Sequence, residues 1–274
     1  MKFSSLGPIA ALALLAASFS AAAHADQLAE IKSRGTLVCG VLSTLDPFGY
    51  MDPNTREVVG YDVDFCKGVA KQLGVKPELR QLSLDARIPE LSQGRVDVLA
   101  AVLGYTPARA SQIAFSDAYF LSLQKLAVQQ DSGLNALADL NDKRISSIKG
   151  SSTQNFVRAT IPGAKIVSYD DAPSAFMALT QRKVDGFGLT EAMLRRFIIK
   201  LGPEATLKVI DAPLGQEQWG LGIKKDEPQL LAAVNTALNK MEESGEAQAI
   251  FDKWLGKDSV YHMERTFKIE PIKP

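Results

Sequence analysis

The sequence has few of the residues that build metal, redox or nucleic-acid sites. Its 274 residues include two cysteines and two histidines, and 31 basic residues balance 31 acidic ones, for a formal net charge of zero. Without an excess of positive charge there is no electrostatic footprint for a polyanion. Cys39 and Cys66 are too few and too far apart for a zinc motif, and the histidines are too scarce for a His-rich site. We therefore expect no metal, no cofactor and no nucleic-acid partner.

Long hydrophobic runs are also scarce, and the one that is present lies at the N-terminus. Lys2 precedes the apolar stretch IAALALLAASFSAAA, which ends in the small-x-small pattern Ala23-His24-Ala25. This is typical of a secretory signal peptide cleaved after Ala25. A membrane anchor is the alternative, disfavoured because the segment is short and no basic cluster follows it. No later window approaches 18 apolar residues, so we expect an exported protein of 249 residues in a bacterial periplasm.

Short apolar runs alternate with amphipathic segments along the remaining chain. Thr36 to Val41 is typical of a strand buried on both faces, and Tyr61 to Leu73 has helical spacing that ends at Gly74. The same alternation predicts strands over Pro77 to Leu82, Val96 to Ala101, Arg144 to Ile148, Lys165 to Tyr169 and Val184 to Leu189, and helices over Leu28 to Ser33, Arg87 to Gln93, Gln154 to Ile161, Pro173 to Arg182 and Pro228 to Ser244, with another ending near Trp254. This rhythm indicates an α/β fold.

Two α/β lobes fit the chain length better than one. The extended stretches 119–123 and 215–219 can cross between them, so we expect a first lobe of residues 26–118 and 220–274 and a second of residues 124–214. Open α/β sheets bind ligands at the carboxyl ends of their strands. Two such lobes facing each other predict a ligand cleft between them.

The two cysteines lie on apolar faces of predicted elements. Cys39 is in the first strand and Cys66 is on the helix expected to pack against it. An oxidising periplasm would permit a disulfide, but strand-to-helix geometry must meet narrow limits. We favour two buried free thiols and leave the disulfide as the alternative.

Two polar stretches after predicted strands could bind an anion. Arg109 stands at a helix start, where its guanidinium can hold a carboxylate in a planar two-point pair, although a solvated arginine is the simpler interpretation. The loop from Gly150 to Thr153 opens a helix, where free N–H groups, hydroxyls and the helix dipole favour an anion. Simple capping by Ser152 or Thr153 explains the same loop equally well. The P-loop spacing is absent, which removes the main support for phosphate hydrolysis.

A third polar stretch could receive an amine. Thr190 and Glu191 come at the end of the strand DGFGLT, where an acid and a hydroxyl could accept an ammonium group. Glu191 is equally well explained as a favourable charge in the first turn of the next helix. Together, the anion and amine stretches describe a site for a zwitterion.

Several sequence strings, in order along the chain, carry a resemblance to a known family. They are GYDVD from Gly60, RIPELSQGRVDVLAA from Arg87, TPARASQIAFSDAYF from Thr106, KGSST from Lys149, RKVDGFGL from Arg182 and QEQWGLGIKKDEPQL from Gln216. The chain resembles the family-3 solute-binding proteins of polar amino-acid ABC importers, in particular glutamate/aspartate binders. The resemblance implies a type II periplasmic-binding-protein fold, a monomer that is not an enzyme, and hinge closure on an amino acid delivered to an inner-membrane ABC permease.

The resemblance also implies roles for individual residues. Arg109 matches the arginine that clamps the ligand α-carboxylate, and Ser152 and Thr153 match the second-lobe groups that close on it. Thr190, followed by Glu191, stands where many members have the aspartate that receives the α-ammonium group. Other positions depart from the family pattern as well: Gly104 replaces a Ser or Thr ligand, with Val102 and Leu103 before it.

Side-chain specificity is implied by a further set of positions. Leu42 stands where glutamate binders have arginine and basic amino-acid binders have aspartate, and Leu45 and Leu84 replace the aromatic side chains that enclose the ligand. Leu42 disfavours a basic ligand, and it also weakens the case for glutamate, because burying a second carboxylate without a cation costs several kcal/mol. Further possible pocket residues are Asp46, Phe48, Tyr50 and Arg87. An acidic or polar neutral α-amino acid is expected.

An enzyme on the same scaffold is the alternative, since similar folds include a periplasmic prephenate/arogenate dehydratase in which Glu191 could act as a general acid. A nucleophile and base pair is not evident: the histidine outside the predicted signal peptide, His262, is in the C-terminal tail, and neither cysteine has a partner. A sensor domain cut from a larger receptor is disfavoured because no transmembrane helix follows.

Replacement of the predicted carboxylate clamp tests this assignment. Arg109→Ala should abolish ligand binding and leave the fold intact, because it removes a charge-assisted pair from a partly buried site. Ligand-dependent thermal shifts of the two proteins measure the effect. Unchanged affinity in the variant would contradict the role of Arg109.

Overall fold

The computed structural model describes residues 26–202 and 206–273. The predicted signal peptide therefore lies outside the described residues. Within the described ranges, no helix combines the length and the apolar character needed to cross a bilayer.

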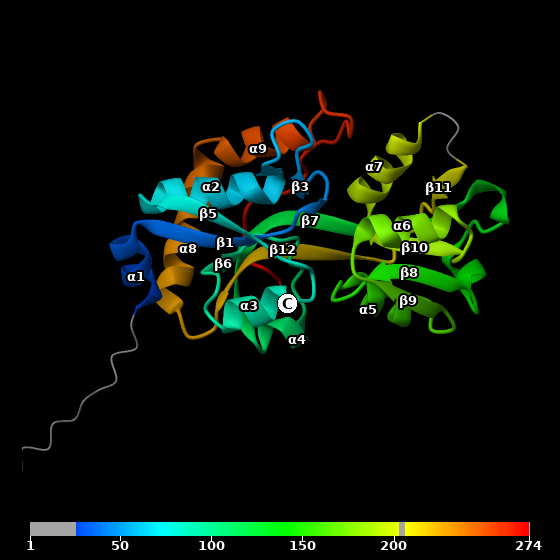
Figure 1. Ribbon diagram of the computed structural model, residues 1–274, viewed down its shortest axis with the longest axis horizontal. Helices are drawn as coiled ribbons and strands as arrows, with labels where there is room; N and C mark the ends of the chain where they lie inside the picture. Colours follow the sequence, from blue (N-terminus) through cyan, green and yellow to red (C-terminus); the bar gives the residue numbers. More distant parts are fainter. Residues whose placement is uncertain (1–25, 203–205, 274) are drawn as a thin grey trace, which may run out of the picture.

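The elements gather in two groups, which we call the first and second lobes (Figure 1). In the first lobe, β1 (Thr36–Val41) pairs in parallel with β5 (Lys76–Gln81) and β6 (Val98–Leu99). Its helices are α1 (Gln27–Arg34), α2 (Tyr61–Leu73), α3 (Arg87–Ser92), α4 (Pro107–Ala110), α8 (Pro228–Glu243) and α9 (Glu246–Trp254), and a small antiparallel sheet contains β2 (Thr44–Leu45), β3 (Gly49–Met51) and β4 (Val58–Val59).

In the second lobe, β8 (Arg144–Ile148) pairs in parallel with β9 (Lys165–Tyr169) and β10 (Gly186–Thr190). Its other elements are α5 (Thr153–Thr160), α6 (Ala172–Thr180), α7 (Glu191–Leu201), β11 (Leu207–Val209) and the 3-10 turns η1 (Gln130–Ser132) and η2 (Leu137–Leu140).

Two long strands, β7 (Ile113–Gln129) and β12 (Gly215–Lys224), run between the lobes (Figure 1). They pair with each other in antiparallel register from Gly215 opposite Gln124 to Lys224 opposite Ile113. β12 also pairs with β6, while β7 pairs with β10 and β11. The strand order β5-β1-β6-β12-β7-β10-β8-β9 is therefore one continuous sheet shared by both lobes.

Both crossing strands are longer than the predicted stretches 119–123 and 215–219. Ser116 and Asp117 are residue types common in turns, but both lie inside β7. The Asp117 N–H donates to Asn235 Oδ1 at 2.9 Å, and Ser116 Oγ accepts from the Leu221 N–H at 2.8 Å. Partners from distant parts of the chain therefore satisfy polar groups that resemble a turn in the sequence.

Helix α2 shows how local pattern and packing agree. It spans Tyr61–Leu73, as predicted, and its side chains Tyr61, Phe65 and Val69 are buried. Gly74 ends the helix with φ +75°, a left-handed conformation that favours glycine, and its N–H donates to carbonyls of the last turn. The other predicted helices are also present, with ends shifted by a few residues.

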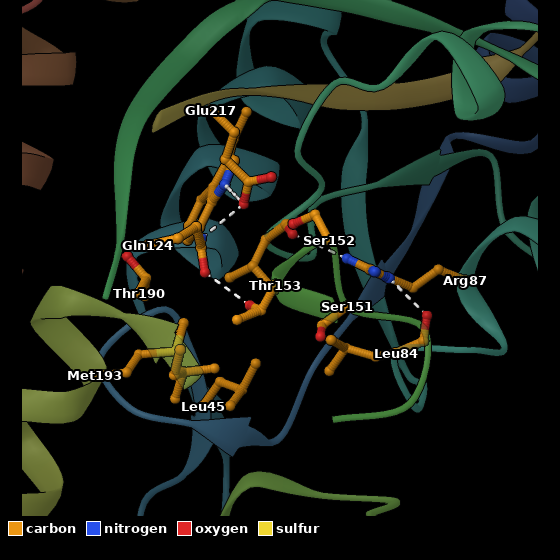
Figure 2. A pocket seen from close by; sticks show the side chains of 13 residues that line it. Leu45, Leu84, Arg87, Gln124, Ser151, Ser152, Thr153, Thr190, Met193 and Glu217 are labelled. Atoms are coloured by element: carbon orange, nitrogen blue, oxygen red, sulfur yellow. Dashed lines mark hydrogen bonds between the residues drawn. The ribbon is translucent and has the colours of Figure 1, made fainter. Parts of the chain in front are cut away.

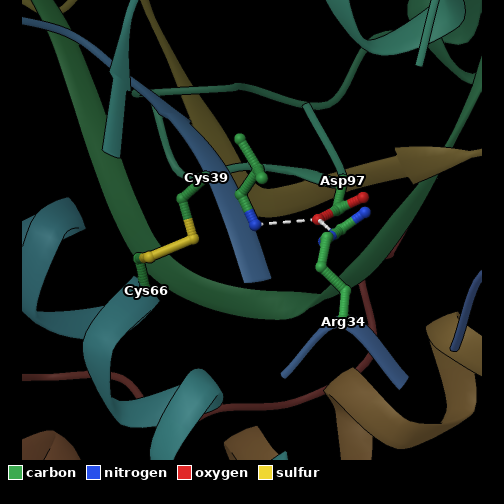
Figure 3. Close-up of a disulfide and its surroundings, with 5 residues drawn as sticks. Arg34, Cys39, Cys66 and Asp97 are labelled. Carbon is green, nitrogen blue, oxygen red and sulfur yellow. Dashed lines mark hydrogen bonds and ion pairs between the residues drawn. A yellow bond between two sulfur atoms is a disulfide. The ribbon is translucent and has the colours of Figure 1, made fainter. Parts of the chain in front are cut away.

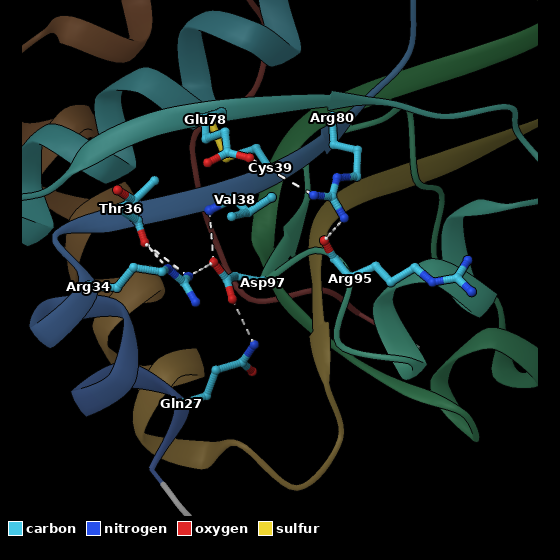
Figure 4. Close-up of polar contacts among 10 residues, drawn as sticks. Gln27, Arg34, Thr36, Val38, Cys39, Glu78, Arg80, Arg95 and Asp97 are labelled. Atoms are coloured by element: carbon cyan, nitrogen blue, oxygen red, sulfur yellow. Dashed lines mark hydrogen bonds and ion pairs between the residues drawn. A yellow bond between two sulfur atoms is a disulfide. The ribbon is translucent and has the colours of Figure 1, made fainter.

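A buried carboxylate ties α1 to the sheet (Figure 4). Asp97 accepts hydrogen bonds from the Val38 N–H at 2.7 Å and Gln27 Nε2 at 3.1 Å, and it forms a salt bridge with Arg34. A strand was predicted over Val96 to Ala101, but only Val98–Leu99 pairs as β6. The Asp97 side chain takes the place of a backbone partner at the start of this strand.

Cys39 and Cys66 form a disulfide (Figure 3), so the expectation of two free thiols was wrong. Cys39 lies on β1 and Cys66 on α2, and both residues are buried. Their Cα atoms are 6.3 Å apart, a separation that a disulfide can span. Sequence could place both cysteines on apolar faces, but only the packing of α2 on β1 sets the distance between them.

Loss of this disulfide should destabilise the first lobe. The two cysteines are 27 positions apart, and closing a loop of that length corresponds to about 3.5 kcal/mol in the chain-entropy description. We expect Cys39→Ala/Cys66→Ala to melt roughly 10 °C below the wild type.

Thermal unfolding with and without a phosphine reductant provides the control. The reductant should lower the melting temperature of the wild type and leave that of the double variant unchanged. Two results together would contradict the prediction. They are a wild-type melting temperature that the reductant does not change, and a double variant that melts at the same temperature as the wild type.

Candidate functional site

A small pocket lies where the crossing strands meet both lobes (Figure 2). The cavity is about 20 Å³. Its lining combines polar and apolar side chains from distant parts of the chain: Arg87, Gln124, Ser151, Ser152, Thr153, Thr190 and Glu217, with Leu45, Leu84, Val102, Leu189, Met193 and Trp219. Polar groups that converge among apolar ones are the usual lining of a small-molecule site, although a cavity of this volume holds about one water molecule.

Arg87 brings a buried positive charge to this pocket. The residue is 2% exposed and starts α3. Its guanidinium donates to four backbone carbonyls, those of Leu84, Ala101, Val102 and Gly150, at 2.7 to 3.1 Å. No carboxylate of the described residues forms a salt bridge with it. Burial, reinforced by the nearby charge of Arg109, lowers the pKa of Arg87 to about 9, while Glu217 and Asp62 oppose that shift. The guanidinium is therefore a cation held by dipoles, without a direct counterion in the described chain.

A second guanidinium reaches the same carbonyl from the first lobe. Arg109 donates to Gly104 O at 2.7 Å and to Gly150 O at 2.9 Å. Gly150 immediately precedes the turn that opens α5 in the second lobe. Two arginines of the first lobe thus converge on one backbone oxygen of the second lobe.

A chain of hydrogen bonds crosses the pocket from α5 of the second lobe to the crossing strands (Figure 2). Thr153 Oγ1, on α5, donates to Gln124 Oε1 at 2.7 Å. Gln124 Nε2 donates to Glu217 Oε1 at 2.8 Å, and Trp219 Nε1 donates to the same oxygen at 2.8 Å. Gln124 comes from β7, while Glu217 and Trp219 come from β12. The crossing strands therefore contribute polar groups to the pocket besides joining the lobes.

A buried acid behind the pocket positions one of its walls. Asp62 Oδ2 accepts from the Val102 N–H at 2.7 Å, and Asp62 Oδ1 accepts from the Tyr119 hydroxyl at 2.7 Å. Val102 has φ +44°, which is unusual for a β-branched residue and requires such support. The carbonyl of Val102 in turn accepts from Arg87. Asp62 thereby supports the backbone that holds the buried guanidinium.

Six of the predicted site residues line this pocket: Leu45, Leu84, Val102, Ser152, Thr153 and Thr190. They come from both lobes, as a cleft between the lobes requires. Thr190 is engaged within the protein, because its hydroxyl contacts Ser122 Oγ at 2.7 Å. Ser152 is the N-cap residue of α5, but its side chain accepts no capping hydrogen bond, and the Thr153 hydroxyl donates to Gln124. Hydroxyl capping therefore does not explain this loop.

Four predicted site residues lie outside the lining. Arg109 reaches the rim through Gly150, Leu42 is buried elsewhere in the core, and Gly104 packs behind Glu217. Glu191 faces away from the pocket, because it pairs with Lys125 at 3.2 Å and Arg195 at 2.6 Å. Burial raises the pKa of Glu191, but these two cations outweigh it and leave the pKa below the usual range. The first-turn interpretation of Glu191 therefore fits its position better than a pocket role.

The other possible pocket residues divide in the same way. Arg87 lines the cavity, whereas Phe48 belongs to an aromatic cluster with Trp219 and Phe120. Asp46 lies at a contact between the lobes, and Tyr50 packs edge-on against Trp254.

The sequence did not point to six of the lining residues: Gln124, Ser151, Leu189, Met193, Glu217 and Trp219. Glu217 and Trp219 fall within the predicted crossover 215–219, and Gln124 directly follows the other crossover. A charged and an amide side chain in predicted extended segments was the available signal. It was not decisive, because sequence does not show which face of a strand such residues occupy.

Ion pairs join the lobes on both sides of the pocket. Asp85 pairs with Lys149 at 3.1 Å on one side. On the other, Asp46 pairs with Arg196 and Lys200 of α7, both at 2.9 Å. The lobes are thus held together around the pocket by contacts near its rim.

The titration of Asp62 should be visible in the stability of the protein. Burial raises the pKa of Asp62 from 3.8 to about 7. The hydrogen bonds from Tyr119 and Val102 and the charge of Arg87 lower this pKa but do not outweigh burial. The Tyr61 hydroxyl is a further titratable group near Asp62. Between those two pKa values the folded protein holds a proton that the unfolded chain releases, so this group lowers stability as the pH rises. The melting temperature of Asp62→Asn, minus that of the wild type, should therefore increase from pH 5 to pH 7 and level off above it.

Thermal melts of both proteins in matched buffers measure this difference. The constant cost of placing an amide beside the Val102 N–H cancels, because only the change with pH is compared. A difference that stays constant from pH 5 to pH 8 would contradict the raised pKa.

Comparison with known proteins places this architecture among characterised solute receptors. The ABC transporter glutamine-binding protein GlnH of Bacillus subtilis is 28% identical over 85% of this chain and 86% of its own. The L-cystine-binding protein TcyJ of Escherichia coli is 28% identical over 94% of this chain and 99% of its own. The crystal structure of a mutant ArgBP from T. maritima superposes with a TM-score of 0.77 at 31% identity, covering 83% of this chain and 98% of that one.

The predicted two-lobed type II fold is confirmed by these structural similarities and by the shared mixed sheet. Residues 37–257 match the family described as bacterial extracellular solute-binding proteins, family 3. The matched segment contains the second lobe, the crossing strands, every residue of the pocket lining and most of the first lobe; α1 lies outside it. The chain therefore belongs to the family-3 bacterial extracellular solute-binding proteins.

Proposed function

We propose that this protein is the substrate-binding component of an amino-acid ABC importer, and that it binds an α-amino acid in the pocket and releases it unchanged. The convergence of Arg87 and Arg109 on Gly150 O carries the proposal. Two guanidiniums without a salt bridge in the described chain face the start of α5, where backbone N–H groups also favour an anion. A carboxylate entering there would meet charge from one lobe and backbone donors from the other. A ligand held in this way stabilises the closed arrangement.

The proposed motion is hinge closure of two lobes, residues 26–118 with 220–274 and residues 124–214. Segments 119–123 and 215–219 of β7 and β12 would form the hinge. The pairing of these strands supports a hinge because an antiparallel ribbon can bend or twist while its backbone hydrogen bonds remain. The ion pairs of Asp46 and Asp85 with the second lobe would form on closure and add to the contacts made through the ligand.

The ligand class follows from charge and lining. Relatives are named for glutamine, L-cystine, arginine, or glutamate and aspartate, so family membership leaves the ligand open. Leu42 lies outside the lining, and the pocket contains the buried cation Arg87. That cation favours an acidic or polar neutral side chain and opposes a basic one, because two positive charges close together in a buried pocket repel each other. We propose an acidic or polar neutral α-amino acid.

Cellular placement forms part of the same proposal. The N-terminal segment would direct export and be cleaved after Ala25, leaving a monomeric receptor in the periplasm. The closed, loaded form would then dock on an inner-membrane ABC permease. Extracellular solute-binding relatives of ABC transporters support this placement.

A thermal-shift screen tests the proposal. The purified protein is heated with each of the twenty L-amino acids, L-cystine, GABA and prephenate, since a ligand that binds only the folded state raises the melting temperature by mass action. At a concentration of about 100 times the dissociation constant, stabilisation is about 2.7 kcal/mol, or a shift of roughly 5 to 10 °C. We expect a shift with at least one acidic or polar neutral L-amino acid and none with its D-enantiomer.

Other results would oppose the proposal in distinct ways. Stabilisation by L-arginine or L-lysine alone would contradict the ligand class inferred from Arg87. Prephenate converted to an aromatic product, detected by absorbance, would favour an enzyme. Absence of a shift with every amino acid would contradict amino-acid binding altogether.

A further inference from the structure

Glu217 carries a buried carboxylate whose hydrogen-bonding capacity is only half used. The residue is 6% exposed and lines the pocket from β12. Its Oε1 accepts from both Gln124 and Trp219. Its Oε2 is buried and has no hydrogen-bond partner within residues 26–202 and 206–273. In Figure 2 this carboxylate points inward toward the other lining side chains.

A buried carboxylate oxygen without a donor is energetically unfavourable. Leaving such a group unsatisfied costs at least about 1 to 3 kcal/mol, and more for a charged group. Glu217 also forms no salt bridge within the described part of the chain. Arg87 and Arg109 act on it only at longer range, since each guanidinium donates to backbone carbonyls instead. An ammonium group of a ligand would supply both the missing donor and the missing charge.

Gly104 provides the space that this carboxylate occupies. A Cβ atom at position 104 would lie 2.1 Å from Glu217 Oε2 and 2.4 Å from its Cδ. Any larger residue there would have to displace the carboxylate. The absence of a side chain at Gly104 and the presence of an acid at Glu217 are therefore linked by one steric contact.

The other candidates for receiving an ammonium group are already engaged. Both oxygens of Glu191 pair with cations outside the pocket. The Thr190 hydroxyl contacts Ser122 Oγ and also donates to Leu123 O at 3.3 Å. Asp62 uses both oxygens behind the pocket wall. Among the pocket-lining residues, Glu217 is the acid, and its Oε2 lies beside Gly104 without a donor from the described residues.

We propose that Glu217 receives the α-ammonium group of the bound amino acid at Oε2, and that Gly104 is the positioning residue that makes room for it. This inference rests on the proposed function. It places the negative charge of the pocket on β12, and the positive charges of Arg87 and Arg109 on the α3 and α4 side. A zwitterion would lie between them, with its ammonium group held by the crossing strand itself.

Isothermal titration calorimetry with wild type, Glu217→Gln and Glu191→Gln tests the inference. The probes are the twenty L-amino acids and L-cystine, followed by the analogue of each binding amino acid that lacks the α-amino group. Glutamine at 217 keeps an Oε1 acceptor for Gln124 and Trp219 and replaces Oε2 by a donor. We expect Glu217→Gln to weaken amino-acid binding at least about tenfold, because a desolvated charge pair is lost. Glu191→Gln is the matched control and should bind like the wild type.

The analogue separates a direct contact from a general loss of structure. Wild type and Glu217→Gln should differ little in affinity for the acid without the amino group. Equal losses for amino acid and analogue would assign Glu217 a structural role and overturn the inference. Amino-acid affinities of Glu217→Gln within about threefold of wild type, or a loss in Glu191→Gln instead, would also overturn it and leave the proposed function standing. A wild type that binds none of the amino acids overturns the proposed function and this inference together.

Gly104→Ala provides an independent test if Glu217→Gln does not fold, as judged by its melting curve. The added Cβ should displace the Glu217 carboxylate and weaken amino-acid binding by a similar factor, while the analogue without the amino group is affected less. Unchanged amino-acid affinity in Gly104→Ala would contradict the steric link between the two residues.

Discussion

The antiparallel pairing of β7 with β12 is the interaction on which the rest of the structure depends. It joins the parallel strands of the first lobe to those of the second in one sheet. Because the two strands are hydrogen-bonded to each other, neither lobe can move without bending this ribbon. The same ribbon places Gln124 and Glu217 in the pocket, so the element that connects the lobes also forms part of the site.

The buried charges of the pocket, Arg87 and Glu217, form no salt bridge with each other. Arg87 is surrounded by carbonyl dipoles, and burial lowers its pKa to about 9, yet no carboxylate of the described chain contacts it directly. Glu217 likewise accepts two hydrogen bonds but meets no cation. Burying such charges costs free energy unless a group of opposite charge pairs with them. A pocket with unpaired charges of both signs is suited to a ligand that carries both.

Much of the fold could be predicted because it depends on local pattern. The span of α2 follows from helical spacing and from Gly74, which readily adopts the left-handed C-cap conformation. The length of β7 could not be predicted, since Ser116 and Asp117 are satisfied by Leu221 and Asn235, more than a hundred residues away. The disulfide could not be predicted for the same reason, because only the packing of α2 on β1 brings Cys39 to Cys66.

The sequence by itself determined the family, the alternation of strands and helices, and the residue types at the strand ends, including Thr153 and Thr190, which do line the pocket. Only the tertiary structure decided which polar side chains meet. It turned Glu191 toward Lys125 and Arg195, and it brought Glu217 against Gly104. The physical reason is that a strand or helix pattern specifies a face, whereas a site requires faces from several distant segments to be oriented together. That orientation is set by the shared sheet and its long-range packing.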